Sequence, residues 1–174
     1  MKQIISILGP NAVGKSTTAS ILLEKCPMSA YIDSDWCRAI NPFVFTPSTK
    51  RAVTENIYCL LKNYLLCDDI ETIIFPHSFH GERKAIFEEV ISRLENEQIK
   101  FGVHHILLKC SEEENHKRAI ADGRDEARIL RGMKNTFHYY DEFSYPVIDT
   151  TKLKPEQVAE QILKIVEEAG KYQN

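Results

Sequence analysis

The sequence predicts an α/β fold in three layers, with a five-stranded parallel sheet flanked by helices. Short apolar runs alternate with longer amphipathic stretches from one end of the chain to the other, which is the pattern of repeated strand–helix–strand units. The runs are apolar throughout, as expected for strands that are covered on both faces. The 174 residues contain no repeat or linker, so we expect one domain spanning residues 1–174.

Each predicted element follows from its pattern and its boundaries. The predicted strands are short and end at Gly, Pro, Asp or Ser; they are 3–8, 30–32, 70–75, 103–108 and 147–148. Pro27 ends a first helix over 15–25, and Pro47 begins a second one that continues to residue 66. Apolar residues on one face predict helices over 83–96 and 155–168. Ser111 and Glu114 form a capping box for the helix after the fourth strand.

Charge and cysteine content exclude several classes of function. The chain has 22 basic and 25 acidic residues, for a net charge of −3, so we expect no nucleic-acid partner and no binding to an anionic membrane. No apolar stretch approaches the roughly 20 residues of a spanning helix. The five cysteines form no C-x-x-C pair, which favours free, buried thiols in a reducing compartment. We therefore expect a cytoplasmic protein.

Residues 9–16 carry the most informative motif. Gly9-Pro10-Asn11-Ala12-Val13-Gly14-Lys15-Ser16 fits G-x-x-x-x-G-K-[ST], and it follows a predicted strand and opens a predicted helix. The two glycines let the backbone turn its amides toward phosphate oxygens. The Lys15 ammonium is placed to reach the β- and γ-phosphates, Ser16 to bind Mg²⁺, and Thr17 to contact the α-phosphate. The sequence thus predicts binding of ATP with Mg²⁺ in a P-loop NTPase sandwich.

Two carboxylates follow the predicted second strand, in Asp33-Ser34-Asp35. The third and fourth strands end without an acid, unlike the strand that ends in Asp-Glu in motor proteins. A loop leaving the second strand lies beside the phosphate loop in this fold. The two carboxylates can therefore divide their roles, one near Mg²⁺ and the acceptor oxygen, the other binding a substrate hydroxyl.

At these motifs the chain resembles the small P-loop kinases, the group of shikimate, gluconate, adenylylsulfate and nucleoside monophosphate kinases. Asp33, Asp35 and Arg38 give D-x-D-x-x-R, as in the adenylylsulfate kinases. The resemblance implies that Asp33 is the magnesium-side or general-base carboxylate, and that Asp35 and Arg38 face the acceptor. The alternative is a purely structural one, an Asx turn with a surface arginine.

Residues 118–131 resemble the short arginine-bearing lid of the monophosphate kinases. That likeness implies that Arg118 lies over the adenine ring and that Arg124 reaches the transferring phosphates. For Arg128 and Arg131 two interpretations stay open, a role in the lid or an exposed helix with Asp125 and Arg128 as i,i+3 partners. The segment after the last strand resembles the adenine-side loop of these kinases, which places Thr150 beside the nucleotide.

The loop after the third strand departs from these kinases, which often have an arginine or a glycine run there. It contains His77 and His80 instead, and we consider both as substrate-binding residues as well as structural ones. The aromatic residues Trp36, Phe43 and Phe45 either line an apolar acceptor pocket or cover the second helix as core.

The favoured function is a kinase that transfers the γ-phosphate of ATP to a small-molecule acceptor, at a hydroxyl group. Asp33 and Asp35 suit a hydroxyl better than a phosphate acceptor, since Arg38, Arg51 and Arg83 are the only early arginines that could bind a phosphate. The alternatives are a nucleoside or nucleotide kinase, an antibiotic phosphotransferase, and an ATP-binding protein without a dedicated acceptor, similar to the tunicamycin-resistance protein. The net charge disfavours a nucleic-acid kinase. The oligomeric state is not predicted.

Overall fold

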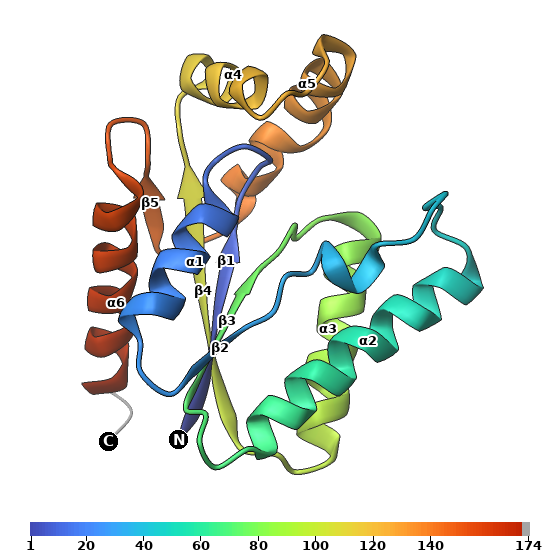
Figure 1. The fold of residues 1–174 in the computed structure, drawn as a ribbon, viewed down its shortest axis with the longest axis vertical. Coiled ribbons are helices and arrows are strands. Elements are labelled where there is room, and N and C mark those ends of the chain that lie inside the picture. The colour runs from blue at the N-terminus through green and yellow to red at the C-terminus, as the bar shows by residue number, and fades with distance from the viewer. Residues whose placement is uncertain (172–174) are drawn as a thin grey trace.

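A five-stranded parallel sheet forms the centre of the computed structural model, which describes residues 1–171 (Figure 1). The strand order is β2-β3-β1-β4-β5. The bounds are β1 Lys2–Leu8, β2 Ser29–Tyr31, β3 Thr72–Pro76, β4 Phe101–Lys109 and β5 Val147–Asp149. The phosphate-loop strand β1 lies in the middle, between β3 and β4. The carboxyl ends of all five strands therefore meet at one edge, above which the loops of the candidate site lie.

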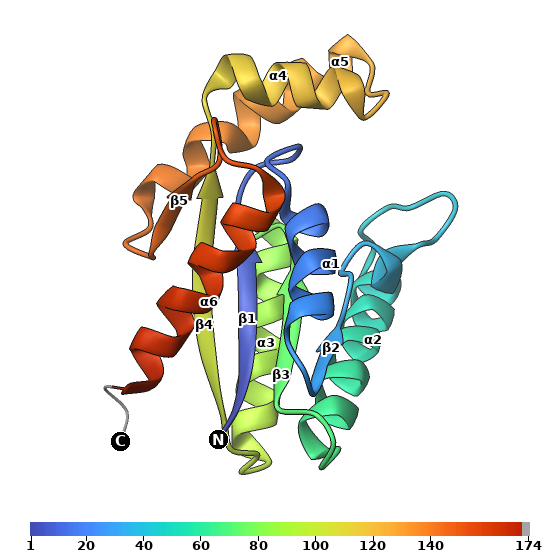
Figure 2. The same ribbon diagram turned by 60° about the vertical axis from the view of Figure 1, so that its left-hand side comes forward.

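Two pairs of helices cover the two faces of the sheet (Figure 2). Helices α1 (Lys15–Lys25) and α6 (Pro155–Lys171) pack on one face, and α2 (Pro47–Leu66) and α3 (Gly81–Asn96) pack on the other. The alternation along β1 separates the two cores. Ile4 and Leu8 are buried under α2 and α3, whereas Ile5 and Ile7 are buried under α1 and α6. The predicted three-layer α/β fold is confirmed.

A chain of short helices crosses above the carboxyl edge of the sheet (Figure 1). It comprises α4 (Glu112–Ala121), α5 (Glu126–Gly132), a π-helical turn (Met133–Phe137) and a 3-10 turn (His138–Glu142). We call this segment the arm. The sequence predicted the helix after Ser111 and offered an exposed helix at Asp125 and Arg128 as one of two interpretations, but it did not predict the helical turns from residue 133 to 142. Those turns are too short to show an amphipathic period.

Local details of two helix starts differ from the prediction. The Ser111 hydroxyl accepts the Glu114 amide at 3.2 Å, but the Glu114 carboxylate turns to the Arg118 guanidinium instead of completing the box. The full capping box lies at α2, where the side chains of Thr46 and Thr49 each accept from the other's backbone. Helix α3 begins at Gly81, two residues before the predicted start.

Two expectations about cysteines and membrane spans can be compared with the structure. All five cysteines are free thiols, as predicted, but only Cys37 and Cys110 are buried, whereas Cys59 is exposed. Within residues 1–171, none of the helices combines the length and the apolar character needed to cross a membrane.

Candidate active site

The loop between β1 and α1 adopts a conformation that depends on its glycines. Gly9 has a φ of +141°, and a Cβ at this position would lie 2.4 Å from the carbonyl oxygen of Leu108 on β4. Any side chain at Gly9 would therefore clash with the neighbouring strand's backbone. Gly14 has a φ of +99° and caps the start of α1. The loop and the positive end of the α1 dipole together form a cradle for an anion.

The Lys15 side chain folds back over this loop. Its ammonium donates to the carbonyl oxygens of Gly9 at 2.9 Å and Pro10 at 2.7 Å. The pKa of Lys15 is lowered to about 8, mainly by removal from water; Asp35 and Asp33 oppose the shift, and nearby Arg124 adds to it. The charges of Asp33, Asp35 and Arg124 thus all act on Lys15, although these residues come from two other segments of the chain.

A cavity of about 460 Å³ opens above the loop, and we call it the phosphate cavity. Most of the predicted site residues line it. They are Asn11, Ala12, Val13, Gly14, Lys15, Ser16, Thr17, Asp33, Asp35, His77, Arg118, Arg124 and Thr150. Gly9 lies behind the loop, and Arg38 and His80 line a neighbouring cavity. The sequence-predicted residues are therefore brought to one place in the fold.

Asp33 is held in place by its own segment. Its Oδ2 accepts the Tyr31 hydroxyl at 3.1 Å, and its Oδ1 accepts the Asp35 amide at 2.8 Å. Burial raises the pKa of Tyr31 to about 12, and Asp33 adds to the rise, so this hydroxyl stays protonated and donates. The Asx turn considered from the sequence is present, and it orients the carboxylate that faces the phosphate cavity. Asp35 pairs with Arg38 within the same turn.

The oxygen donors at the cavity fit a magnesium ion. Ser16 and Asp33 both line it, and each offers the hard oxygen ligands that Mg²⁺ prefers. Within residues 1–171 there is no cluster of three His, Cys, Asp or Glu side chains that could cage a metal. Such a sparse set is compatible with Mg²⁺, which is usually bound by one or two protein ligands together with substrate phosphates.

Arg118 forms a bridge between three segments. Its guanidinium donates to the Thr150 carbonyl at 2.8 Å, to the Thr150 hydroxyl at 3.0 Å and to the Val13 carbonyl at 3.4 Å. Glu114 accepts from its Nε at 2.8 Å. Thr150 is itself buried and donates to backbone carbonyls. Arg118 and Thr150 therefore fasten α4 and the β5–α6 loop to the phosphate loop. Their predicted contacts with adenine stay predictions.

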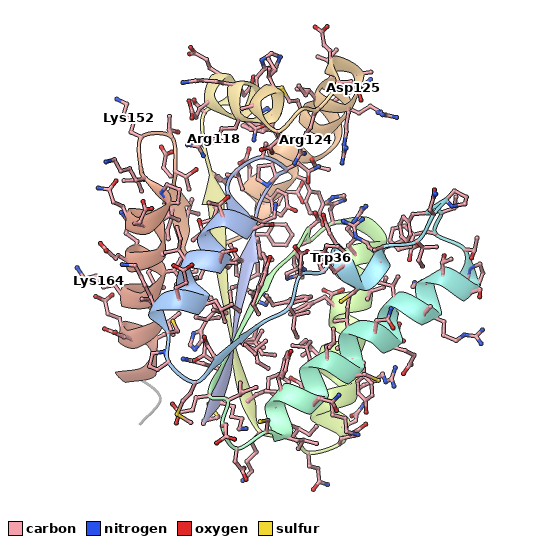
Figure 3. All side chains as sticks on the ribbon, viewed as in Figure 1. Trp36, Arg118, Arg124, Asp125, Lys152 and Lys164 are labelled. Carbon is pink, nitrogen blue, oxygen red and sulfur yellow. The ribbon has the colours of Figure 1, made fainter. Side chains whose placement is uncertain are left out.

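The arm places Arg124 over the phosphate loop. Figure 3 shows Arg118 and Arg124 between the arm and that loop, whereas Asp125 lies on the outer side. Asp125 is the N-cap of α5, and its carboxylate accepts the Arg128 amide at 2.8 Å. Buried Asn115, which sequence reasoning missed, donates to the Asn11 carbonyl at 2.8 Å. No sequence signal separates Asn115 from other polar residues of an amphipathic helix.

His77 belongs to a buried polar row that crosses three strands. Its Nε2 lies 2.9 Å from the Ser6 hydroxyl, which in turn lies 3.0 Å from Nδ1 of His105. The ring stacks on Phe87 with centroids 4.5 Å apart. Burial, followed by the nearby His105 and Lys15, holds the pKa of His77 well below its usual range. His77 is thus a neutral core residue with one edge at the phosphate cavity.

A second cavity of about 460 Å³ adjoins the first, and five arginines line it. We call it the arginine cavity. The two cavities share Asn11, Asp35, Ser78 and Arg124. His80 lines the arginine cavity, and so do Arg128 and Arg131, for which the sequence had left two interpretations open. Arg51 is exposed on α2, outside the walls of both cavities.

The aromatic residues after Asp35 divide between the two predicted roles. Phe43 and Phe45 pack edge to face, 4.8 Å apart, against the core under α2 and α3. Phe45 also borders a narrow slot beside Arg38 and Arg83. Trp36 is 77% exposed and lines a groove that also contains Asp33 and residues of α2, so its part in an acceptor pocket stays a prediction.

Comparison with known proteins finds the same fold in several kinases and in a resistance protein. No family model matches the chain, and no curated protein matches it in sequence. A gluconokinase from Sinorhizobium meliloti superposes with a TM-score of 0.66 at 14% identity, over 99% of this chain and 97% of that one. The tunicamycin resistance protein of Deinococcus radiodurans gives 0.60 at 23% identity, over 95% and 96%.

A third structure, the APS kinase of Mycobacterium tuberculosis in complex with AMPPNP and APS, gives 0.62 at 16% identity, over 95% and 98%. These matches cover nearly the whole of each chain. At such low identities they establish the fold and leave the activity open. The chain has the fold of the small P-loop kinases, with its phosphate loop, Asp33 and two arm arginines around one cavity.

Proposed function

We propose that this chain is an ATP-dependent phosphotransferase that phosphorylates a hydroxyl group of a small molecule. The observation that carries the proposal is the phosphate cavity, in which Lys15, Asp33 and Arg124 converge from three segments. A phosphate loop alone is shared with switches and motors. A carboxylate opposite the loop, combined with an arginine above it, is the set of groups that phosphoryl transfer to an alcohol requires.

Each residue has a defined part in the proposed reaction. The loop amides and Lys15 bind the phosphates, and Arg124 neutralises charge on the transferring oxygens. Asp33 accepts the proton of the acceptor hydroxyl while the oxygen of that hydroxyl forms a bond to the γ-phosphorus. The bond from that phosphorus to the bridging oxygen breaks, and ADP leaves. Mg²⁺, when bound near Ser16 and Asp33, screens the charge of the phosphates.

The test measures acceptor-dependent ADP release with a panel of sugars, nucleosides, nucleotides and antibiotics. Lys15→Ala should abolish turnover, whereas Lys164→Ala, on the outer side of α6 (Figure 3), should leave it unchanged. Asp33→Asn should lower kcat by about 10²–10⁴-fold as a general base would. Its control is Asp69→Asn, exposed between α2 and β3. An unchanged rate in Lys15→Ala would refute the proposal.

A second candidate is nucleotide-dependent binding of a drug without phosphoryl transfer. It is favoured by the 23% identity shared with the tunicamycin resistance protein over 95% of this chain. Thermal unfolding separates the two candidates, because a ligand stabilises the protein according to RT ln(1 + [L]/Kd). A further rise in Tm from tunicamycin in the presence of Mg·ATP, without ADP release from any acceptor, would favour the second candidate.

A further inference from the structure

The arginine cavity concentrates positive charge in a chain that is acidic overall. Five arginines line it against one carboxylate, that of Asp35, while the whole chain has a net charge of −3. The arginines come from separate segments. Arg38 lies in the turn after β2, Arg83 on α3, Arg124 in the α4–α5 loop, and Arg128 and Arg131 on α5. Like charges gathered from distant segments repel one another, so an anion bound between them would relieve a cost of the fold.

Three of these arginines are left without acidic partners. Arg38 pairs with Asp35, and Arg124 pairs with Asp122 at 3.4 Å. Within residues 1–171, no carboxylate lies within ion-pair distance of Arg83, Arg128 or Arg131. The acid that precedes α5, Asp125, is already engaged in capping that helix. A solvated helix face normally mixes both signs, so this arrangement does not resemble an ordinary surface.

Arg83 is the most constrained member of the set. Its guanidinium lies over the Phe45 ring, 5.5 Å from the centroid. Its Nε is buried and, among the described residues, has no hydrogen-bond partner. Burial, followed by the nearby Arg38, lowers the pKa of Arg83. A buried donor without an acceptor is costly, and an anion bound by the rest of this guanidinium would offset part of that cost.

His80 lies in the positive field of these arginines and adds no charge to it. Burial, followed by Arg83, Lys15 and Arg38, lowers the pKa of His80 to about 4. The imidazole is therefore neutral at physiological pH. Ser78 and Thr136 bring hydroxyl groups to the same walls. The cavity thus combines guanidinium forks with neutral hydrogen-bonding groups, a composition suited to phosphate and sulfate oxygens.

We propose that the arginine cavity binds a phosphate or sulfate group carried by the acceptor itself. This inference rests on the proposed function, and it names the acceptor class as hydroxyl compounds bearing a doubly charged oxyanion. Asp35 and Arg124 line both cavities. An acceptor with its anionic group among the arginines would therefore extend toward Asp33, where its hydroxyl is phosphorylated.

The proposal revises the argument drawn from the sequence. The first half of the chain offers only Arg38, Arg51 and Arg83, which are too few for a charged acceptor. In the fold, Arg51 lies outside the arginine cavity, whereas Arg124, Arg128 and Arg131 of the arm line it. A hydroxyl nucleophile and an anionic group on the same molecule are compatible with these walls. Binding would also draw the arm toward α3, because arginines of both line the cavity.

The experiment titrates inorganic phosphate, sulfate and acetate into protein saturated with Mg·AMPPNP, so that the phosphate loop is occupied. Trp36, the single tryptophan, directly follows Asp35 and serves as the fluorescent reporter, with calorimetry as a second readout. Phosphate and sulfate should bind saturably, and acetate about tenfold or more weakly, since it offers less charge to the arginines. A preference between phosphate and sulfate identifies the group on the acceptor.

Arg83→Gln and Arg128→Gln should each weaken phosphate binding by about tenfold or more, as expected for loss of hydrogen bonds to a charged group. Arg51→Gln is the matched control and should bind as the unaltered protein does. Arg128 is exposed, so its substitution tests the site without disturbing the core. Saturable binding that Arg51→Gln weakens as much as Arg128→Gln does would overturn the proposal, as would no saturable binding of either anion.

The two proposals fail in different ways. If AMPPNP does not bind, the titration is repeated with Lys15→Ala, in which the phosphate-loop site is impaired. Phosphate binding that persists there and requires Arg83 supports the arginine cavity even if the kinase proposal fails. Phosphate binding that is lost in Lys15→Ala shows that the anion had occupied the phosphate loop, and it refutes the arginine cavity as the anion site.

Discussion

Lys15 is a cation whose charge depends on what surrounds it. In the free protein its ammonium contacts two loop carbonyls, and removal from water brings its pKa to about 8. A bound triphosphate would surround the same group with negative charge and raise its pKa. The proposed nucleotide binding would therefore be linked to proton uptake at this residue.

We expect the Kd of Mg·ATP to rise about tenfold between pH 7 and pH 9, because the free protein must then reprotonate Lys15 before it binds. Below pH 7 the group is already charged, so the Kd should be constant. Calorimetry in buffers of different ionisation enthalpy should detect proton uptake near pH 8 and little at pH 6.5. A Kd that does not change from pH 7 to pH 9, without proton uptake, would contradict the assignment; Lys15→Arg, whose charge is constant over this range, is the control.

The arm is an element whose position depends on a few polar contacts. Asn115 and Arg118 tie α4 to the phosphate loop. At the other end, the buried Tyr140 hydroxyl accepts the backbone amide of Phe79 at 3.0 Å and so fastens the arm to the β3–α3 loop. The arginines of α5 are held over the cavities from both sides by these contacts.

Tyr140→Phe should lower the free energy of unfolding by about 1–3 kcal/mol, because it leaves the buried Phe79 amide without an acceptor. Since Phe79 precedes His80, a loosened loop should also weaken phosphate binding in the arginine cavity. Tyr139→Phe, at the neighbouring half-buried position, is the matched control and should change neither quantity. Urea denaturation and the phosphate titration measure the two effects. Equal stability of the two variants would show that this hydrogen bond does not hold the arm.

At the scale of the whole molecule, the polar row of Ser6 on β1, His77 directly after β3, and half-buried His105 on β4 lies beside an otherwise apolar core. Burial lowers the pKa of both His77 and His105. The folded state therefore keeps these imidazoles neutral, whereas the unfolded chain protonates them near pH 6.5. The unfolded state binds more protons below that pH, which disfavours folding in acid.

Stability should be greatest above about pH 6.5 and fall as the pH decreases, by up to about 1.4 kcal/mol per pH unit for each buried histidine. Denaturant unfolding from pH 7.5 to pH 5 measures this slope. His77→Asn should reduce it, even if the variant is less stable at pH 7.5, while His116→Asn, at a half-buried position on α4, should leave it as it is. A slope that His77→Asn does not change would contradict the role of the row.

Much of the fold could be predicted because its signals are local. Apolar runs and prolines located all five strands and the helices over 15–25 and 47–66 to within a few residues. The short turns of the arm, by contrast, contain too few residues to carry a period. The candidate site divides in the same way, because Lys15 and Asp33 stand in contiguous motifs. Arg83 and Arg131 have no motif, and Asn115 resembles any polar helix residue.

The sequence by itself determined the phosphate loop, its strand and helix, and the carboxylate that faces it. These features depend on residues that are adjacent in the chain. Only the tertiary structure decided which arginines share a cavity, because the arm folds back over the sheet edge and brings α5 opposite α3. Charges that are far apart in the sequence are placed together by packing and by a few buried hydrogen bonds. Their proximity is a property of the fold.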